Sequence, residues 1–356
     1  MGKAVRTVRS KKDNYPYATA RVKARKATLI PRSQYMKYMV MDLPSIIRHI
    51  SETAYAKEVS DLSSKYSGLD LVEAATYENL ARNYTEVLGF CGGKLREDLQ
   101  KYLKKWDIWN IKTILRGKSF GAPADEIIED LVTAGSLSRN YLHELAKAED
   151  LDAVIDLMKP TEYYKPVLDA RLSSGAIDHM KFENALDKEY LVSLLTIGSG
   201  SSWLSRILDR FFRVEIDIAN LKLMFKLKYA ELECDYILKF LIPGGYELTD
   251  TVLKRLGMTE DFDKFLDELK GFEFWNAIKE PAEVARETGT LNPIMSALEI
   301  YHLRMANKFG RLYPLSILPF LAYFIWKKVE VDNIRIICRG KEAGLSDDLI
   351  KSMLVT

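Results

Sequence analysis

The stretch NIKTILRGKS at residues 110–119 ends in the three letters, GKS, that close a nucleotide-binding P-loop. Such a loop also needs an early glycine, because the turn it permits lets backbone amides point at phosphate oxygens, and Lys112 occupies that position. The preceding text, LREDLQKYLKKWDIWN, has apolar residues three and four apart, which predicts a helix instead of a strand. A second candidate, GFCGGKL at 89–95, has Leu88 for the first glycine and Leu95 for the hydroxyl. We therefore expect a helix at 110–119 and no phosphate-binding loop in either stretch.

Other residue types with catalytic or ligand-binding chemistry are scattered. The four histidines are His49, His143, His179 and His302, and their spacing matches no metal site, so a structural role is expected for each. His143 and Glu144 begin a zinc-protease pattern, but Lys147 stands in place of the second histidine. The stretch GSGSSW at 198–203 lacks the third glycine, the preceding strand and the later acid of a dinucleotide loop, and predicts a connection between helices. The sequence thus indicates no catalytic, cofactor-binding or metal-binding residue.

The segment NIKTILRGK has two counterparts, NLKLMFKLK at 220–228 and NIRIICRGK at 333–341. All three share an asparagine, an aliphatic residue, a basic residue, two apolar residues and a second basic residue. The asparagines are 110 and then 113 residues apart, which exceeds the roughly 20 to 50 residues of solenoid units and indicates a repeat of domain size. An acidic residue stands three positions before each asparagine, namely Asp107, Asp217 and Glu330.

The similarity extends into the flanking sequence. DLPSIIRHISETAYAKEV (42–59) aligns without a gap with DLDAVIDLMKPTEYYKPV (150–167), whereas only FWNAIKEPAEV (274–284) can be placed in the third copy. The segments YENL, FENA and, more loosely, ALEI put Glu78, Glu183 and Glu299 at corresponding positions. Equivalent positions of different repeats should lie a domain apart, so we do not expect these carboxylates to form a catalytic pair.

Each repeated segment, drawn as a helix, has one apolar face and one basic face. The basic positions are Lys112, Arg116, Lys222, Lys226, Arg335 and Arg339. Two interpretations are open: three solvated helix faces, where such charges usually lie, or a socket that binds an acidic partner if the domains stand around an axis. Gly117 and Gly340 fall where a left-handed helix cap belongs, and Leu227 interrupts that cap in the second copy.

The composition, 47% apolar and 29% charged residues, is typical of a chain that buries a full core. Helix-period patterns dominate and no series of alternating strand patterns occurs, so the expected fold class is all-α. The repeat divides the 356 residues into three expected domains: 1–135 with a basic N-terminal segment, 136–243, and 244–356.

Three further features bear on location. The longest apolar run, LYPLSILPFLAYFIW at 312–326, contains two prolines and is shorter than the roughly 20 residues of a membrane span, so we expect a buried helix. Cys91, Cys234 and Cys338 match no metal pattern; the place of Cys338 in the repeat indicates core packing, and the three together a reducing interior. The first 26 residues carry nine Lys or Arg and one Asp, which suits a transit peptide, a nucleic-acid arm, a contact for anionic lipid or acidic protein, or a solvated chain start.

With the repeat established, the chain resembles the C subunit of the archaeal and bacterial V/A-type ATP synthases, a family that includes the d subunit of the eukaryotic vacuolar ATPase. The resemblance rests on YPYATARVKARKATLIPRSQYMKYM (15–39), SETAYAKEV (51–59) and the C-terminal EVDNIRIICRGKEAG (330–344), and it covers essentially the whole chain.

This resemblance implies three similar helical domains arranged as a funnel with pseudo-threefold symmetry, and a non-catalytic role without a cofactor. Family members lie on the cytoplasmic face of the membrane, on the proteolipid ring, and receive the lower end of an axle made of the D and F subunits. Some of the six basic residues would then face the axle or the ring. The alternative from the residues alone is a helical scaffold whose basic N-terminus binds nucleic acid, with an affinity that weakens with salt. The transported ion and the working direction leave no mark in this sequence.

Overall fold

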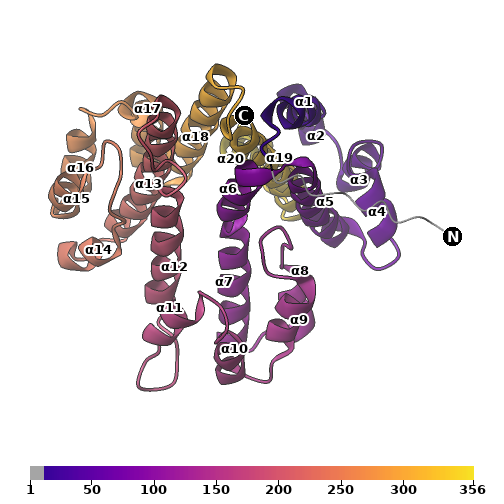
Figure 1. The fold of residues 1–356 in the computed structure, drawn as a ribbon, viewed down its shortest axis with the longest axis horizontal. Helices are drawn as coiled ribbons and strands as arrows, with labels where there is room; N and C mark the ends of the chain where they lie inside the picture. Colours follow the sequence, from indigo (N-terminus) through magenta and orange to yellow (C-terminus); the bar gives the residue numbers. More distant parts are fainter. Residues whose placement is uncertain (1–11) are drawn as a thin grey trace.

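The structure is a computed structural model that describes residues 12–356, and its regular elements are helices (Figure 1). Within that range the β pairing is limited to an isolated bridge between Arg171 and Ile177. The all-α prediction is therefore confirmed. Four of the nine basic residues at the chain start, Lys3, Arg6, Arg9 and Lys11, lie outside the described part, and the expectations for this segment stay predictions.

Three long helices carry the repeated segments: α7 (Lys105–Ser119), α13 (Trp203–Tyr229) and α19 (Leu318–Glu342). The helix predicted at 110–119 is thus confirmed. A short helix follows each of them: α8 (Ala124–Glu129), α14 (Cys234–Phe240) and α20 (Asp347–Met353). Shorter helices form three further sets. The first set is α2 (Arg32–Met39), α3 (Leu43–Ile50) and α4 (Ala56–Leu62), and the second is α9 (Arg139–Lys147), α10 (Leu151–Leu157) and α11 (Tyr164–Asp169). The third set is α15 (Asp250–Gly257), α16 (Phe262–Leu269) and α17 (Trp275–Thr288). Each set leads into a longer helix: α5 (Gly68–Phe90) after the first, α12 (His179–Leu194) after the second and α18 (Asn292–Leu312) after the third. The remaining helices of the described part are α1 (Tyr15–Lys26) and α6 (Gly93–Leu103).

The repeated asparagines make the same contact three times. Asn110 donates from its amide to the carbonyl of Val132 (2.9 Å) and accepts from the N–H of the same residue (2.8 Å). Asn220 makes the same pair of bonds with Ile242, and Asn333 makes it with Val355, in each case 22 residues further along the chain. All three asparagines are buried, so each double bond satisfies backbone groups that water does not reach. We call this contact the asparagine clasp.

The acidic residues three positions before the first two asparagines accept hydrogen bonds from the backbone of the next stretch of chain. Asp107 accepts from the N–H groups of Ser136 and Leu137, both at 2.9 Å, and Asp217 accepts from those of residues 246–248. Glycine precedes both stretches because a β-carbon on Gly135 or Gly245 would lie 2.1 Å from the aspartate oxygen. The close approach of backbone to carboxylate therefore requires glycine at these two positions.

The third acid, Glu330, accepts hydrogen bonds from residues in the N-terminal part of the chain. Glu330 accepts from the N–H of Ile30 (2.5 Å) and from the hydroxyl of Tyr55 (2.6 Å). The corresponding hydroxyl in the first copy is that of Tyr163, which reaches Asp107 at 3.3 Å. Residues before α2 and α4 thus contact α19 as the residues before α9 and α11 contact α7, which joins the first helices of the described part to the last long helix.

The third copy of the short helices, which the sequence placed only at 274–284, begins earlier. The side chains of Asp42, Asp150 and Asp261 cap α3, α10 and α16 by accepting backbone N–H bonds. Thirteen residues after these caps come Tyr55, Tyr163 and Phe274, which each precede the next helix. Residues 261–278 are therefore the gapless counterpart of 42–59, and Phe274 takes the place of Tyr55 and Tyr163.

The predicted glycine caps are wrong in position. Gly117 and Gly340 lie inside α7 and α19, where a β-carbon would clash with Ile127 at 2.5 Å and with Ile350 at 2.6 Å. They are small because α8 and α20 pack against them. The left-handed residues come four positions later: Gly121 (φ 72°), Gly344 (φ 66°) and, in the second copy, Glu231 (φ 54°).

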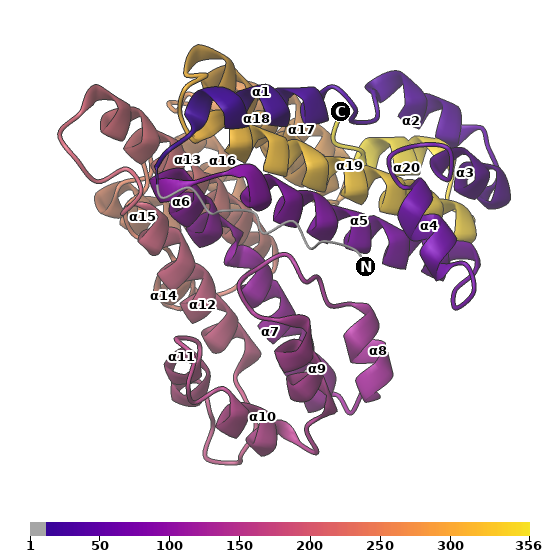
Figure 2. The same cartoon turned by 45° about the vertical axis from the view of Figure 1, so that its right-hand side comes forward.

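Two cores stabilise these helices. The smaller consists of buried residues from Ile108 to Leu186 on α7 to α12, and the larger joins the remaining helices. In Figure 2, α1, α5, α18 and α19 lie together, while α7 and α12 extend away from them toward α10 and α11. The predicted apolar helix is buried from Leu318 to Ile325, as is Cys338, whereas Leu312 and Leu315 are exposed.

We expect Asn220→Ala to lower the free energy of unfolding by about 2 to 4 kcal/mol, because it leaves the buried N–H and C=O of Ile242 without partners. Urea denaturation measures the change. Asn292→Ala, at an exposed position, is the matched control and should change stability by less than about 0.5 kcal/mol. Equal effects of the two substitutions would contradict the role of the clasp.

Glu231→Gly should stabilise the protein by up to about 1 kcal/mol, since it removes a non-glycine residue from the left-handed region. Gly344→Ala, the reverse change at the equivalent position with nothing within 4 Å of the added β-carbon, should destabilise it by a similar amount. Thermal unfolding followed by circular dichroism compares the two. A stability loss in Glu231→Gly would refute the assignment of strain to this residue.

Candidate functional site: the basic residues of the long helices

The six basic residues of the repeat lie on α7, α13 and α19, and five of them form ion pairs with the neighbouring helices α12, α18 and α5. The pairs are Lys112–Asp187 (2.6 Å), Arg116–Glu183 (2.5 Å), Lys222–Glu299, Arg335–Glu73 (3.1 Å) and Arg339–Glu73 (2.8 Å). Lys226 forms no ion pair with a residue in the range 12–356 and is exposed. The charged face of each long helix therefore joins it to another helix of the same chain.

The pair between α19 and α5 is the most buried. The side chain of Arg335 is 8% exposed and its guanidinium lies 3.7 Å from the ring centroid of Tyr77. Burial lowers the pKa of Arg335 to about 10, although Glu73 opposes the shift. Burial also disfavours the ionised form of Glu73, but the hydrogen bond from Arg339 and the charges of both arginines outweigh it and hold the pKa of Glu73 below its usual value.

Between α13 and α18, Glu299 faces several cations. Burial alone would raise the pKa of this carboxyl, but the charges of Lys222, Lys328 and His302 lower it to about 2. Lys328 also pairs with Asp332 on its own helix. This cluster links α18 to two long helices, and the carboxyl of Glu299 within it is ionised at neutral pH.

Between α7 and α12, the two pairs differ in exposure. The Lys112 side chain is 16% exposed and that of Arg116 is 55% exposed. Burial raises the pKa of Asp187 more than the adjacent Lys112 lowers it. Beside them, α7, α12 and α13 enclose a cavity of about 440 Å³, and Lys226 and Lys105 contribute to its lining. Burial lowers the pKa of Lys105 to about 8, and the lining also includes Glu183 and Asp187, so the cavity wall carries charges of both signs.

The interpretation of these residues as solvated helix faces is therefore wrong for Arg335 and Lys112, which are largely buried. Arg116, Lys226 and Arg339 remain exposed, and their contact with a partner stays a prediction. Sequence reasoning missed Asp187 and Glu73 as partners. The signal for Glu73 was its spacing, because it precedes Glu183 by 110 residues, the separation of the first two repeated asparagines.

The carboxylates that recur in YENL, FENA and ALEI do not converge. Glu183 and Glu299 pair with Arg116 and Lys222 as described, and Glu78 pairs with Arg139 on α9 at 2.5 Å. Each therefore belongs to a different contact between helices, and Glu73 of α5, not Glu78, binds a repeated arginine as Glu183 of α12 does.

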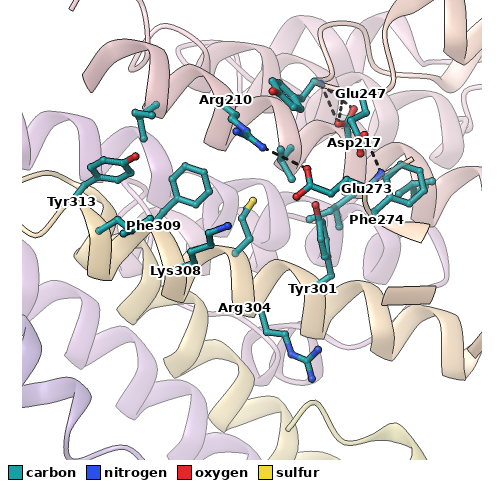
Figure 3. A pocket seen from close by; sticks show the side chains of 17 residues that line it. Arg210, Asp217, Glu247, Glu273, Phe274, Tyr301, Arg304, Lys308, Phe309 and Tyr313 are labelled. Carbon is teal, nitrogen blue, oxygen red and sulfur yellow. Dashed lines mark hydrogen bonds and ion pairs between the residues drawn. The ribbon is translucent and has the colours of Figure 1, made fainter. Parts of the chain in front are cut away.

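A cavity of about 480 Å³ lies between α13 and α18 (Figure 3). Asp217 at its edge is bound by backbone N–H groups, and burial raises the pKa of this carboxyl to about 6 against the effect of those bonds. Glu247 accepts from the N–H of Glu273 at 3.0 Å, and Glu273 lies 3.5 Å from Arg210, whose guanidinium is 4.7 Å from the ring centroid of Tyr246. The acidic groups that line this cavity are thus engaged in contacts with the surrounding loops and helices.

Three histidines make contacts of the structural kind that was expected. His302 lies 2.9 Å from Glu215, His49 lies 3.2 Å from the hydroxyl of Tyr38, and the ring of His179 stacks on Phe120. Across residues 12–356, no group of three His, Cys, Asp or Glu side chains has an arrangement that could hold a metal ion.

The helices and the charge network define a class of protein: an all-helical chain whose repeated acidic, amide and basic side chains join its own helices to one another. Hydropathy over the described part of the chain shows no helix that is long and apolar enough to cross a membrane.

Comparison with known proteins identifies the family to which this chain belongs. The sequence profile of the ATP synthase (C/AC39) subunit family matches residues 18–353, and the chain belongs to this family. It is 40% identical to the C subunit of the A-type ATP synthase of Methanosarcina acetivorans over 344 residues, which cover 96% of this chain and 93% of that protein. It is 38% identical to the same subunit from Methanococcoides burtonii (96% and 94% covered) and 34% identical to that from Archaeoglobus fulgidus (96% of each chain). The resemblance seen in the sequence is confirmed.

Glu73→Gln should lower the free energy of unfolding by about 2 to 3 kcal/mol, because it leaves the buried guanidinium of Arg335 without a counter-charge. Glu183→Gln is the matched comparison and should cost less than about 1 kcal/mol, since its partner Arg116 is more than half exposed. Chemical denaturation of both variants tests the difference, and a smaller loss in Glu73→Gln would contradict it.

The stability that the ionised carboxyl of Glu299 contributes should be lost in acid. Its pKa is lower in the folded protein than in the unfolded chain, so it contributes stability above about pH 4.5 that is lost as the pH falls toward 2. Melting temperatures of the wild type and Glu299→Gln should therefore converge between pH 5 and about pH 3. Glu287→Gln, on the exposed side of α17, serves as the control. A constant difference across this range would refute the linkage.

Proposed function

We propose that this chain is a non-catalytic central-stalk subunit of a V/A-type ATP synthase, which couples the axle of the D and F subunits to the membrane proteolipid ring during rotary ion transport. The observation that carries the proposal is the family match over residues 18–353, together with relatives named as the C subunits of A-type ATP synthases. The complex would synthesise or hydrolyse ATP elsewhere, and this chain would lie at the cytoplasmic face of the membrane without a span of its own.

The internal contacts suit a mechanical role. A coupling that transmits torque must resist local opening, and densely packed helices joined by buried polar contacts do so better than mobile loops. The long helices are each tied at an asparagine, at an acid and through a basic side chain. Load applied to one helix is therefore passed to its neighbours through several short contacts.

We infer that the partner surface includes the exposed cations of the six, Arg116, Lys226 and Arg339, with Lys112, Lys222 and Arg335 behind them. An acidic partner could approach the exposed residues without breaking the buried pairs. Charges at such a surface set the approach and register of partners more than the raw affinity. We further propose that the three expected domains stand around an axis as a funnel, with the partner surface on its inner side.

Co-purification from native membranes tests the proposed function. The chain should leave the membrane with the proteolipid ring and with the D and F subunits. In membranes depleted of the chain, ATP hydrolysis by the head should continue while ATP-driven ion uptake is lost, and adding the chain back should restore uptake. Full ion uptake without the chain would reject the proposal.

Lys226→Glu should reduce ATP-driven ion uptake severalfold while hydrolysis continues, because it reverses an exposed charge that has no ion pair within residues 12–356 to lose. Lys264→Glu, an equal charge change at an exposed position on α16, should leave uptake unchanged. The ratio of ions transported to ATP hydrolysed is the measurement. Equal ratios in both variants would remove Lys226 from the partner surface and leave the family assignment intact.

A further inference from the structure

A cavity of about 380 Å³ lies where the C-terminal half of α1 meets α18 and the first turns of α19. Its polar lining is cationic, with Lys23 and Lys26 from α1, Arg311 from α18, and the neutral amide of Asn307. Among the residues that the structure describes, no carboxylate lines it. None of these three cations forms an ion pair with another residue of the described range 12–356.

The residue next to Lys26 in the chain, by contrast, has a counter-charge. Arg25, next to Lys26 in the chain, points toward α5 and pairs with Glu86 at 2.5 Å, and it also donates to Asn83 at 3.0 Å. The helices next to the long helices, α12, α18 and α5, likewise supply an acid for five of the six cations of the repeat. A cluster of cations without acidic partners around a cavity is thus unusual within the described part of this chain.

The cavity also has a defined shape. Its floor is apolar and includes Gly310 and Ala322, where a β-carbon on Gly310 would lie 3.2 Å from that of Ala322, so α18 and α19 cross closely beneath it. Lys26 is positioned by a 2.7 Å hydrogen bond to Asn307 and lies 5.4 Å from the ring centroid of Trp326. The ammonium group is therefore held in place at the cavity without an ionic partner from residues 12–356.

The electrostatics agree with an uncompensated site. Burial, followed by the charge of Arg311, lowers the pKa of Lys26 to about 8. A bound anion would offset both effects at once. Because the cations act from both α1 and α18, an anion between them would also draw these helices together.

We propose that this cavity binds a phosphate group, with Lys26 and Arg311 as its main ligands and Lys23 at the rim. A guanidinium offers two parallel N–H donors to phosphate oxygens, and an ammonium adds a compact charge. The volume exceeds that of a bare phosphate ion, and the apolar floor fits an attached organic group. A phospholipid headgroup and a free phosphate are the two sources that share this chemistry, and the site does not depend on the proposed function.

The test uses the full chain in two arms: calorimetric titration with inorganic phosphate, and sedimentation with vesicles of phosphatidylglycerol mixed with phosphatidylcholine. The double variant Lys26→Gln/Arg311→Gln should weaken binding about tenfold or more in each arm in which the wild type binds, since it removes two charge-assisted contacts. Binding in both arms identifies a general phosphate site, and binding to vesicles alone identifies a lipid headgroup site.

The matched control is Lys254→Gln/Lys264→Gln, which removes the same charge from exposed side chains of α15 and α16. It should stay within about twofold of the wild type at equal salt, because it leaves the cavity intact. If the control loses as much binding as the cavity variant, or if the wild type binds in neither arm, the proposal is overturned. Melting temperatures establish that the variants are folded, and the single surface variant Arg311→Gln should weaken binding in the same direction.

Discussion

The structure depends on a buried side-chain amide that pairs with the backbone of one residue, 22 positions further along the chain, at Asn110, Asn220 and Asn333. An amide can donate and accept at once, so it replaces the two partners that a peptide group would otherwise lose on burial. An aspartate in its place could accept but could not donate at neutral pH. The clasp fixes where the chain returns to each long helix, and the short helices that follow are positioned from there.

The acids near the clasps extend this constraint from single helices to the whole chain. Asp107 and Asp217 bind amides about 30 residues ahead, and glycines make room for those loops. Glu330 instead binds Ile30, which is 300 residues away in sequence. The residue before Ile30 is Leu29, where the other two loops have glycine. The first and last parts of the chain are thereby held as one unit, a property that fits a subunit loaded by rotation.

Much of this could be predicted from residue spacing. The helical class, the repeat of Asn and acid, and the buried place of Cys338 follow from local patterns that survive folding. The acidic partners of the basic residues could not be predicted from local patterns. Glu73 and Arg339, for example, are 266 residues apart, and only tertiary packing brings them together. The left-handed residue was placed at Gly117 instead of Gly121, since glycine has two uses at a helix end, tight packing and positive φ. The third copy of the short helices was hidden because Phe274 lacks the hydroxyl of its counterparts.

The central claim is that the clasps and the acid contacts join both ends of the chain into one stable unit. Hydrogen exchange of individual backbone amides tests it most directly. The N–H of Val355, second from the C-terminus, and that of Ile30 are held by Asn333 and Glu330, so both should exchange only at the slow rate of global unfolding. In an Asn333→Ala variant the Val355 amide should exchange orders of magnitude faster. Exchange of these two amides in the wild type at the rate of a frayed chain end would contradict the account.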